Sequence, residues 1–514
     1  MKRDGASMSI WQGTIADYIT MNNLQDKEYD VVIVGAGITG LTTAVQLQNS
    51  GLSCLIIEAN TIGFGTTSGT TAHLNTFFDT TYQQVIKSFG EKNAKLLVKG
   101  AKASMALIKQ NIDTYKIDCD YEVKEGFLFS LNEKQNKELE EIVGSAKRLG
   151  LPIAFSDNMP FPIPYLKLAC IKKQAQFDPV QYIIGLAKAF EEAGGVIVQN
   201  SRVTDLGEGE NLQVFTSANG MIKAKNIIYA THIPPGKNLL HFRCAPYRSY
   251  VVGVKLKDNA YPHALGYDMN DPYHYYRTQF INGEKYLIAG GEDHKTGHEE
   301  NTQACFRRLE SYVKSYFPVD RIAFRWSSQY YEPVDGLPYI GNLPSNGKNV
   351  YVATGFGGNG MTYGTLSAMI LSDMITKGKS IYQDLFDPNR IKLAAGFFNF
   401  IQEGVDVATE LVSSLFPAHK LDELSGMAPG EAKVVRYHGH VAAIYKDEAH
   451  QIHAIDSKCT HMNCTIAWNT VEKSWDCPCH GSRFTCDGVV LNAPAQKDLE
   501  IVNIEEQINA PAYK

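Results

Sequence analysis

The stretch that decides the fold is YDVVIVGAGITGLTTAVQLQNSGLSCLIIEAN, residues 29–60. Residues 30–34 are rich in Val and Ile and are followed at once by glycines, which is typical of a buried parallel strand. Residues 38–48 show the apolar spacing of a helix, and residues 52–58 return to a strand pattern. Strand, helix and strand together predict a βαβ unit.

The loop between the first strand and the helix carries Gly35, Gly37 and Gly40, a G-x-G-x-x-G motif. The first glycine permits a tight turn, the second lets backbone approach a pyrophosphate, and the third allows close packing of helix on strand. Glu58 ends the second strand 18 residues after Gly40, where a carboxylate can accept hydrogen bonds from a ribose. A structural turn without a ligand is the alternative, but this context favours a dinucleotide site.

Composition and charge limit the class of protein. A chain of 514 residues is long enough for two or three domains, and 44% hydrophobic with 20% charged residues is typical of a globular protein. The net charge of −6 and the lack of a basic run argue against nucleic-acid binding. Residues 1–30 lack the apolar core of a secretory signal, and no stretch approaches the roughly 18 apolar residues of a membrane span. We therefore expect a soluble, cytoplasmic protein.

Four further segments carry a resemblance to a known family: NTIGFGTTSGTTAHL (60–74), IIYATH (227–232), RWSSQYYEPVDGLPYIGNL (325–343) and VATGFGGNGMTYG (352–364). In content and order they resemble the D-amino-acid-oxidase/glycine-oxidase class of flavoproteins, discontinuously over residues 29–375. The resemblance implies FAD as the cofactor. The residues that it implies as FAD contacts are Gly35, Gly37, Ile38, Thr39, Gly40, Glu58, Gly65, Thr66, Thr67, Val203, Thr231, Gly357, Gly358, Gly360, Met361 and Thr362.

A second G-x-G-x-x-G motif, Gly355, Gly357 and Gly360, also follows a strand and opens a helix. A second dinucleotide site would need another strand ending in Asp or Glu about 20 residues later. The chain there reads KGKSIYQDLFDP, residues 377–388, which does not fit. In the flavoprotein class, such a helix N-terminus points at the same FAD, near its ring and ribityl chain. A separate NAD(P)H site remains the alternative, and its absence would argue against a pyridine-nucleotide ferredoxin reductase.

Five of the ten cysteines fall within 28 positions near the C-terminus, in the motifs CTHMNC (459–464) and CPCHGS (477–482) and at Cys486. Such a cluster, in a chain without an export signal, favours metal binding over a disulfide framework. The C-x-H and C-x-x-H spacing closely resembles Rieske proteins. That resemblance implies a [2Fe–2S] cluster with Cys459, His461, Cys477 and His480 as ligands. A mononuclear zinc site is the alternative, since two cysteines and two histidines also suit zinc.

The surroundings of the cluster motif bear on its redox potential. Mixed thiolate and imidazole ligands raise the potential above that of all-cysteine clusters. The resemblance implies a disulfide between Cys464 and Cys479, as in respiratory Rieske proteins. Phe484 replaces a Tyr whose hydroxyl bonds a cysteine sulfur in high-potential members, while the second donor, Ser482, is present. We therefore expect an intermediate potential. Asn463 replaces a usual Gly, and Cys486 is interpreted as a loop thiol.

The substrate site is less clearly encoded. The class resemblance implies oxidation of a C–H bond next to an amine nitrogen, giving an imine that water hydrolyses. Its usual carboxylate-binding Arg, just before the P-x-D-G-x-P stretch, is replaced here by Tyr330, which makes a simple α-amino acid doubtful. The candidate catalytic residues are His73, Tyr273, Arg277 and Tyr330. Arg277 is a possible substitute clamp, Tyr273 aligns with an active-site Tyr of the class, and His73 follows the flavin loop. For His73, Tyr273 and Arg277 a purely structural role is the alternative.

The expected fold is α/β (α+β): a Rossmann-like FAD-binding domain with an antiparallel-sheet substrate domain, followed by a small all-β Rieske domain. We expect an N-terminal extension at 1–28, the FAD-dependent oxidoreductase at 29–380, a helical linker at 381–426 and the Rieske domain at 427–514. The substrate domain is expected as insertions at about 80–200 and 240–330, where helical patterns and then alternating strand patterns occur.

An amphipathic helix is expected at residues 393–416. The favoured interpretation is a strut between the domains. The alternative is a membrane-surface helix that delivers electrons to a quinone. Its polar face carries Glu403, Asp406 and Glu410 instead of basic residues, which disfavours anionic lipid.

Three functions remain possible from the sequence. The first is a flavin- and Rieske-dependent dehydrogenase that oxidises an amine or amino-acid-like substrate and passes electrons through the cluster to a protein or quinone acceptor. The second is an electron-transfer protein that supplies a partner oxygenase. The third is a redox sensor, although no DNA-binding element is recognisable.

Overall fold

The computed structural model describes residues 3–14, 17–24, 28–207, 212–390, 419–420, 427–437 and 440–503. The expected helix at 393–416 lies outside these residues, as does most of the expected linker. Within the described parts of the chain, no helix is long and apolar enough to cross a membrane.

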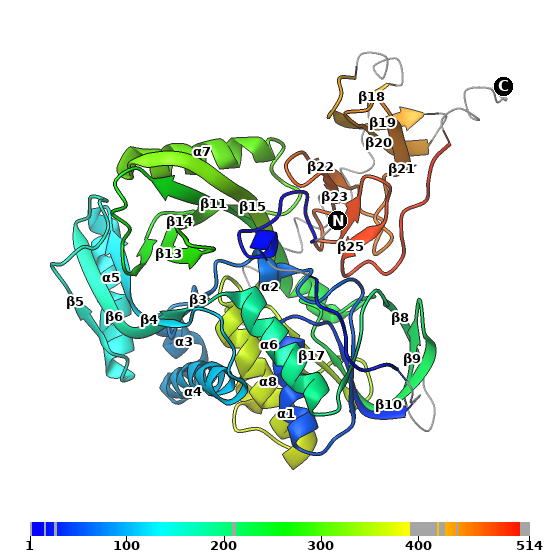
Figure 1. The fold of residues 1–514 in the computed structure, drawn as a ribbon, viewed down its shortest axis with the longest axis horizontal. Coiled ribbons are helices and arrows are strands. Elements are labelled where there is room, and N and C mark those ends of the chain that lie inside the picture. Colours follow the sequence, from blue (N-terminus) through cyan, green and yellow to red (C-terminus); the bar gives the residue numbers. More distant parts are fainter. Residues whose placement is uncertain are drawn as a thin grey trace.

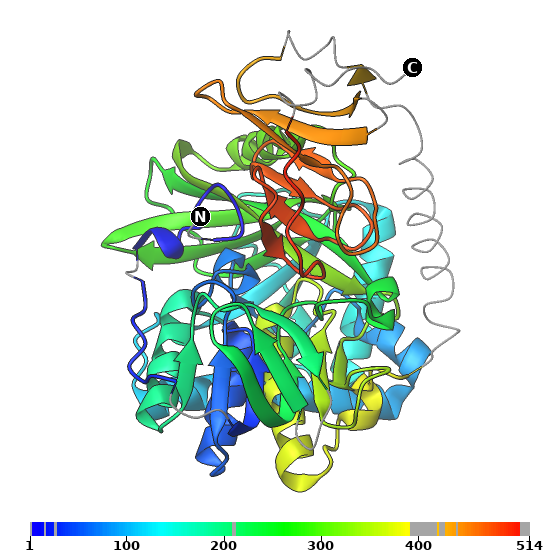
Figure 2. The ribbon, with the colours of Figure 1, turned by 90° about the vertical axis from the view of Figure 1, so that its right-hand side faces the viewer.

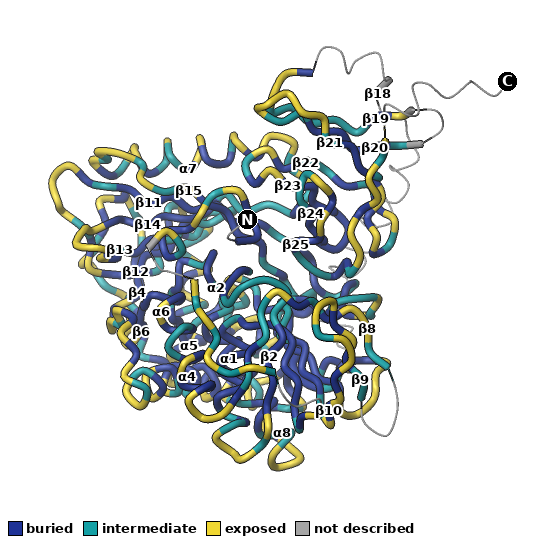
Figure 3. Tube along the Cα trace, turned by 45° about the vertical axis from the view of Figure 1, so that its right-hand side comes forward, coloured by how far each residue is buried: buried dark blue, intermediate teal, exposed yellow. Residues whose placement is uncertain are grey.

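The first sheet has eight strands and is mainly parallel. Its centre is β1 (Glu28–Val34), which pairs in parallel with β2 (Cys54–Ile57) and β10 (Gly220–Tyr229). The remaining strands are β7 (Val196–Val198), β17 (Val350–Thr354), β16 (Tyr339–Asn342), β8 (Val203–Gly207) and β9 (Leu212–Thr216). Central strands are buried almost throughout, as Figure 3 shows. This explains their continuous Val/Ile runs, because helices and loops cover both faces of a parallel sheet.

Helices pack on this sheet and on one another (Figure 1). α1 (Ile38–Asn49) contacts α6 (Pro179–Glu192) and α8 (Gly360–Lys377), and α8 also contacts α4 (Glu91–Tyr115). A side chain at Gly40 would place its Cβ 2.0 Å from the Gly35 carbonyl oxygen, so the closeness of α1 to its strand requires glycine. The other helices are α2 (Thr66–Gly69), α3 (Tyr82–Phe89), α5 (Glu133–Arg148), α7 (Thr302–Tyr316) and α9 (Gln383–Phe386).

The second sheet has nine strands in the order β15-β11-β14-β13-β12-β4-β6-β3, with β5 beside β6. Most of its pairs are antiparallel, as the alternating sequence predicts. Its strands are β3 (His73–Leu74), β4 (Glu122–Ser130), β5 (Ile153–Phe155), β6 (Lys167–Gln176), β11 (Cys244–Leu256), β12 (Leu265–Asp268), β13 (Tyr275–Ile281), β14 (Glu284–Lys295) and β15 (Val319–Pro333).

The C-terminal region forms two four-stranded sheets, which confirms an all-β domain after an α/β one. One contains β18 (His419–Lys420), β19 (Ala432–Tyr437), β20 (His440–Lys446) and β21 (Ile452–Asp456). The other contains β22 (Ala467–Asn469), β23 (Ser474–Asp476), β24 (Arg483–Thr485) and β25 (Val490–Asn492). The second of these sheets lies against the large domain (Figure 2).

The N-terminal segment is built into the interior and runs beside β15 and β24. Ile10 and Trp11 are fully buried, and the Trp11 indole N–H donates to the Thr70 carbonyl oxygen at 2.7 Å. Arg3 donates to the Ser327 carbonyl oxygen at 2.6 Å. These contacts hold the segment where the two domains meet, close to the N label in Figure 1.

Candidate functional site

A cavity of about 510 Å³ opens at the carboxyl ends of the first sheet and extends to the second sheet. Gly35, Gly37, Ile38, Thr39 and Glu58 line one end, where β1 and β2 stop and α1 begins. At Gly35 the backbone φ of 109° and a Cβ position only 2.6 Å from the Ala230 carbonyl oxygen both require glycine. Backbone N–H groups at the start of α1 are therefore close to the cavity, as anion binding requires.

Glu58 sits at this end with its carboxylate held by backbone N–H groups. It accepts hydrogen bonds from the N–H groups of Ala36 and Asn60, both at 2.9 Å. Burial raises its pKa, although these two hydrogen bonds act in the opposite direction. The carboxylate is thus fixed at the cavity wall with lone pairs left for a ribose hydroxyl.

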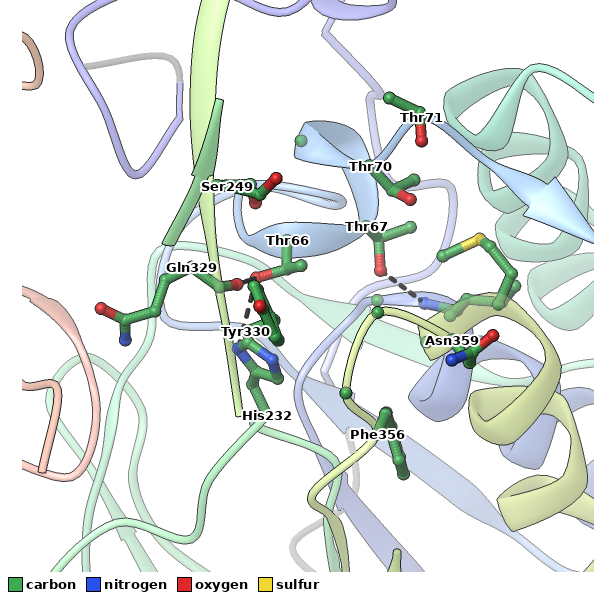
Figure 4. Close-up of a pocket in the computed structure, with 18 of the residues that line it drawn as sticks. Thr66, Thr67, Thr70, Thr71, His232, Ser249, Gln329, Tyr330, Phe356 and Asn359 are labelled. Carbon is green, nitrogen blue, oxygen red and sulfur yellow. Dashed lines mark hydrogen bonds between the residues drawn. The ribbon is translucent and has the colours of Figure 1, made fainter. Parts of the chain in front are cut away.

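The threonine-rich loop forms the next part of the wall. Gly65, Thr66 and Thr67 line the cavity, and the Thr67 hydroxyl accepts a hydrogen bond from the Ile38 N–H at 3.2 Å. The Thr66 hydroxyl donates to the Gln329 carbonyl oxygen at 2.9 Å and lies 3.2 Å from Nδ1 of His232 (Figure 4). The loop therefore joins the start of α1 to the second sheet. Val203 and Thr231 also line the cavity.

The N-terminus of α8 faces the same cavity as that of α1. Gly357, Gly358, Gly360 and Met361 line it, so the two glycine motifs surround one space. Thr362 and Gly40 are not among the lining residues: the Thr362 hydroxyl donates to the Asn75 carbonyl oxygen at 3.0 Å, and Gly40 packs on Gly35. Two helix N-termini and a buried acidic residue around one large cavity fit an elongated dinucleotide with a pyrophosphate.

The other end of the cavity carries two carboxylates that the sequence did not reveal: Asp293 is half-buried, and Asp79 is exposed at the cavity wall. Asp293, on β14, accepts hydrogen bonds from the Ser249 hydroxyl and, at 2.9 Å, from the Tyr330 hydroxyl. Burial raises the pKa of Asp293 to about 7, although both hydrogen bonds oppose this. Asp79 accepts a hydrogen bond from the Gly358 N–H at 2.8 Å, and desolvation raises its pKa as well.

Tyrosines surround these carboxylates, and two of them are among the predicted candidates. Tyr273 lies with its hydroxyl 3.5 Å from Asp79, and Tyr330 contacts Asp293. Tyr275 also lines the cavity, with its hydroxyl 2.8 Å from that of Ser249. We call Asp79, Tyr273, Tyr275, Asp293 and Tyr330 the acidic end of the cavity.

His73 lines the cavity as a neutral side chain. Its Nδ1 lies 2.9 Å from the Thr71 hydroxyl, and its Nε2 lies 3.2 Å from the Tyr276 carbonyl oxygen. Burial and then the charge of Arg277 lower its pKa to about 3. Both ring nitrogens are thus engaged within the protein, and the lowered pKa keeps the ring uncharged at the cavity wall.

Arg277 is not placed as a substrate clamp. Its side chain is fully buried, and its guanidinium donates to the carbonyl oxygens of Thr71, Ala72 and Phe177 at 2.7, 3.0 and 3.2 Å. It does not line the cavity, where Arg202 is the one arginine and lysine is absent among the described residues. Arg202 lies at the nucleotide end beside Val203 and donates to the Val490 carbonyl oxygen at 2.7 Å. The acidic end thus has no cationic side chain in the described chain.

The predicted metal ligands come together between two loops of the C-terminal domain. Cys459 and Cys477 are close enough for their thiols to interact, and the rings of His461 and His480 lie 4.9 Å apart. All four ring nitrogens of these histidines are buried without a hydrogen-bond partner among the described residues. Buried polar atoms need partners, so a pair of neighbouring thiols and a pair of unsatisfied imidazoles fit a metal cluster.

The neighbouring residues hold the two cluster loops together. A disulfide joins Cys464 and Cys479, as the resemblance implies. Asn463 has φ of 62°, the left-handed conformation that favours glycine and that Asn tolerates best among other residues, which explains the replacement. The Ser482 hydroxyl accepts a hydrogen bond from the Ala495 N–H at 3.0 Å. Phe484 is fully buried beneath the site, and Cys486 is partly exposed.

Comparison with known proteins decides the family. The model of FAD-dependent oxidoreductases matches residues 30–374, and the model of the Rieske [2Fe-2S] domain matches residues 416–503. The chain belongs to the FAD-dependent oxidoreductase family. This oxidoreductase binds FAD in its first domain and a [2Fe–2S] cluster in its C-terminal Rieske domain.

Individual relatives agree with this assignment. A Bacillus subtilis protein named Rieske 2Fe-2S iron-sulfur protein YhfW is 33% identical over 94% of both chains. Gamma-glutamylputrescine oxidoreductase of Escherichia coli is 25% identical over 67% of this chain and 83% of its own. The crystal structure of glycine oxidase from Geobacillus kaustophilus superposes with a TM-score of 0.60 at 18% identity, covering 71% of this chain and 99% of its own. This last likeness shows that the oxidoreductase shares its fold with an amino-acid oxidase.

Proposed function

We propose that this oxidoreductase dehydrogenates a C–N bond of a cationic amine, or of an amino-acid-like substrate that presents an amine, and passes the electrons from FAD to the [2Fe–2S] cluster. FAD supplies hydride acceptance from the carbon next to nitrogen, and the cluster supplies one-electron transfer. The observation that carries the substrate class is the acidic end of the cavity.

A substrate ammonium is the ligand that this end is built to bind. Asp79 and Asp293 line the cavity without a cationic partner among the lining residues, and a carboxylate that loses water there is costly unless a cation is paired with it. Tyr273, Tyr275 and Tyr330 add ring faces that attract a cation. A free carboxylate on the substrate would meet negative charge where an arginine clamp would be needed. Hence the geometry favours an amine over a simple α-amino acid.

The positions of the candidate residues support distinct roles. Asp293 and Asp79 bind the ammonium, Tyr330 and Tyr273 orient those carboxylates, and His73 contributes an uncharged ring to the cavity wall. A relative supports the same class, since the name gamma-glutamylputrescine oxidoreductase refers to a derivative of an amine. The cluster then passes the electrons one at a time to a final acceptor, which is a protein or a quinone.

Anaerobic mixing with a panel of substrates tests this proposal. Primary and secondary amines, amino acids and NAD(P)H are each added to the holoprotein, and the flavin absorbance and the cluster electron paramagnetic resonance (EPR) signal are followed together. We expect amines to bleach the flavin and then reduce the cluster. Bleaching by NADH alone would contradict the proposal and favour an electron-transfer protein that supplies a partner oxygenase.

A further inference from the structure

The two histidine ligands of the Rieske domain are covered by the oxidoreductase domain. His461 is 5% and His480 is 2% exposed. The ring of His241 lies edge-on at 4.6 Å from the ring of His461 and 6.1 Å from that of His480. The ring of Phe242 lies 5.3 Å from His480. The histidine edge of the cluster site, meaning the His461 and His480 rings, is thus packed against aromatic residues of the other domain.

His241 is held in this position by the backbone around it. It belongs to a short 3-10 helix, Leu239–Phe242, that Asn238 caps. Its Nε2 lies 2.8 Å from the Pro234 carbonyl oxygen, and its Nδ1 accepts from the Asn238 N–H at 3.2 Å. Both ring nitrogens are therefore engaged, and the ring meets the two ligands through its carbon edge and faces. His241 is a fixed cover and not a further metal ligand.

The same chain segment forms a wall of the flavin cavity. Thr231, His232 and Pro235 line the cavity, and the chain reaches His241 only nine residues after His232. Gly236 donates through its N–H to the Pro494 carbonyl oxygen at 2.9 Å, which joins the segment to the Rieske domain. Residues 231–242 therefore run from the FAD site to the cluster ligands without leaving the interface.

A second connection runs through side chains. The ring of His232 packs edge-to-face on Tyr331 at 4.7 Å, and the Tyr331 hydroxyl donates to the His480 carbonyl oxygen at 3.3 Å. Gln329 donates to the Gly481 carbonyl oxygen at 2.9 Å. His232 and Tyr331 thus link the cavity wall directly to the loop that carries a ligand histidine.

Buried ion pairs hold this interface closed. Arg483 of the Rieske domain contacts Asp476 at 3.0 Å and Asp4 of the N-terminal segment at 3.4 Å, and Glu472 accepts from the Ser327 N–H at 3.1 Å. Arg3 and Arg248 complete the set, and all six charged side chains are nearly inaccessible. Breaking such pairs exposes uncompensated buried charge, so this contact is a permanent one.

We propose that the histidine edge of the cluster is a closed, internal electron-entry face: electrons enter from the flavin across His232 and Tyr331, and His241 and Phe242 keep external redox partners away from that edge. This rests on the proposed transfer from FAD to the cluster. When both cofactors are bound, two one-electron transfers would return the hydride-reduced flavin to its oxidised form with release of one proton to solvent, and each transfer would convert one ferric ion of the cluster to ferrous. A one-electron acceptor outside the chain must reach the cluster from another side.

Two rates test the proposal, the first measured on the holoprotein and the second on the full chain from which the flavin has been removed. The first is internal: the flavin is reduced by light and a sacrificial donor, without substrate, and the cluster EPR signal is followed. The second is external: the flavin-free protein is mixed with dithionite, and cluster reduction is followed. Replacing Phe242 or His241 by Ala opens the edge and should speed external reduction by about tenfold or more, the usual scale for groups around metal ligands. Replacing Tyr331 by Leu should slow internal transfer by a similar factor.

Matched variants separate a specific effect on the two electron-transfer rates from a general loss of structure. The histidine control is His263→Ala, an exposed residue of the same domain, which should change neither rate. Tyr331→Phe keeps the ring and removes the hydrogen bond to His480, and should slow internal transfer less than Tyr331→Leu does. His241→Gln and Phe242→Leu serve where the alanine variants do not fold. EPR g-values that match the wild type show that the cluster ligands are intact.

The outcomes distinguish the inference from the proposed function. If reduced flavin does not reduce the cluster in the wild type, both the transfer and the entry face are wrong. If transfer occurs but both rates in the Phe242, His241 and Tyr331 variants stay within about twofold of the wild type, the histidine edge is not the entry face and the proposed function stands. Faster external reduction together with slower internal transfer supports the inference, because a merely structural defect would not move the two rates in opposite directions.

Discussion

Two groups of carboxylates in this molecule, one in the domain interface and one in the cavity wall, have opposite surroundings. At the domain interface, Asp4 and Asp476 lie beside arginines, and at the acidic end of the cavity Asp79 and Asp293 lie beside tyrosines. Desolvation raises the pKa at all four positions, but at the interface the charges of Arg483 and its neighbours outweigh it and lower the pKa of Asp4 and Asp476. In the cavity, the hydrogen bonds to Asp79 and Asp293 do not outweigh the effect of desolvation, and the pKa of both carboxyl groups is raised.

This difference separates charges that hold the protein together from charges that bind a ligand. A carboxylate whose cation comes from the same chain is already compensated and contributes to the structure. A cavity carboxylate without a cation from the chain is compensated either by a proton, as its raised pKa indicates, or by a cationic ligand. The interface is therefore complete in the folded chain, whereas the acidic end is completed by an ammonium.

The largest effect is expected from breaking the buried ion pairs at the domain interface, which involve Arg3, Asp4, Arg248, Glu472, Asp476 and Arg483. Arg483→Met leaves Asp476 and Asp4 buried with less positive charge, and we expect a loss of about 3–5 kcal/mol in the free energy of unfolding. Thermal unfolding of the holoprotein measures it. The control is Arg321→Met, whose exposed partner Glu284 lies 3.9 Å away and which should cost less than about 1 kcal/mol. Equal losses in the two variants would show that the interface charges are not structural.

Removing one cavity carboxylate should change binding and leave the fold intact. Asp293→Asn keeps the shape and the contact with Tyr330 but loses the negative charge. Losing a charged hydrogen bond to an ammonium is worth about 1.5–3 kcal/mol, so affinity for a cationic amine should fall by roughly 10- to 100-fold. Titration of the anaerobic protein with the amine measures this. The exposed Asp320→Asn is the control and should bind like the wild type.

The pH dependence of amine binding tests whether the charge of Asp293 takes part in binding the cation. Because the pKa of Asp293 is raised to about 7, its carboxylate gains a proton as the pH falls through neutrality, while an alkyl amine stays protonated. Affinity for the amine should therefore weaken by about tenfold from roughly pH 8 to pH 6. Asp293→Asn should abolish this dependence. A wild-type affinity that is flat over this range would mean that Asp293 does not contact the cation.

The two sites also differ in how far the sequence predicts them. The cluster ligands, the disulfide cysteines and the first glycine motif lie within short segments, so a spacing of a few residues encodes their geometry. The nucleotide end of the cavity follows for the same reason, because a strand, a loop and a helix N-terminus are adjacent in the chain. These local features are what sequence periodicity and motifs describe.

The acidic end is assembled over long distances, and only Tyr273 and Tyr330 of its residues were among the predicted candidates, whereas Asp79 and Asp293 were not. Asp293 lies near the end of β14 and Tyr330 lies on β15, so their meeting depends on the pairing of β11 with β14 and β15. Asp79 precedes α3 and joins them from a separate part of the chain. Arg277 shows the converse. It lies on the same face of β13 as Tyr275, two positions away, but its guanidinium is taken up by the carbonyl oxygens of Thr71, Ala72 and Phe177, which no local sequence pattern indicates. The N-terminal segment gave no signal of its buried role, because Arg3 and Asp4 look like ordinary surface charges in the sequence.

The smallest effect concerns the cluster, where the same rule about buried negative charge applies. Reduction adds negative charge to the cluster, and a hydroxyl donor stabilises it, whereas Phe484 offers none. Phe484→Tyr should therefore raise the midpoint potential by a few tens of millivolts, since about 1 kcal/mol of one extra hydrogen bond corresponds to roughly 40 mV for one electron. Ser482→Ala, which removes the donor already present, should lower the potential by a similar amount. Redox titration followed by EPR measures both, and a Tyr variant whose potential stays at the wild-type value would mean that its hydroxyl does not reach a cysteine sulfur.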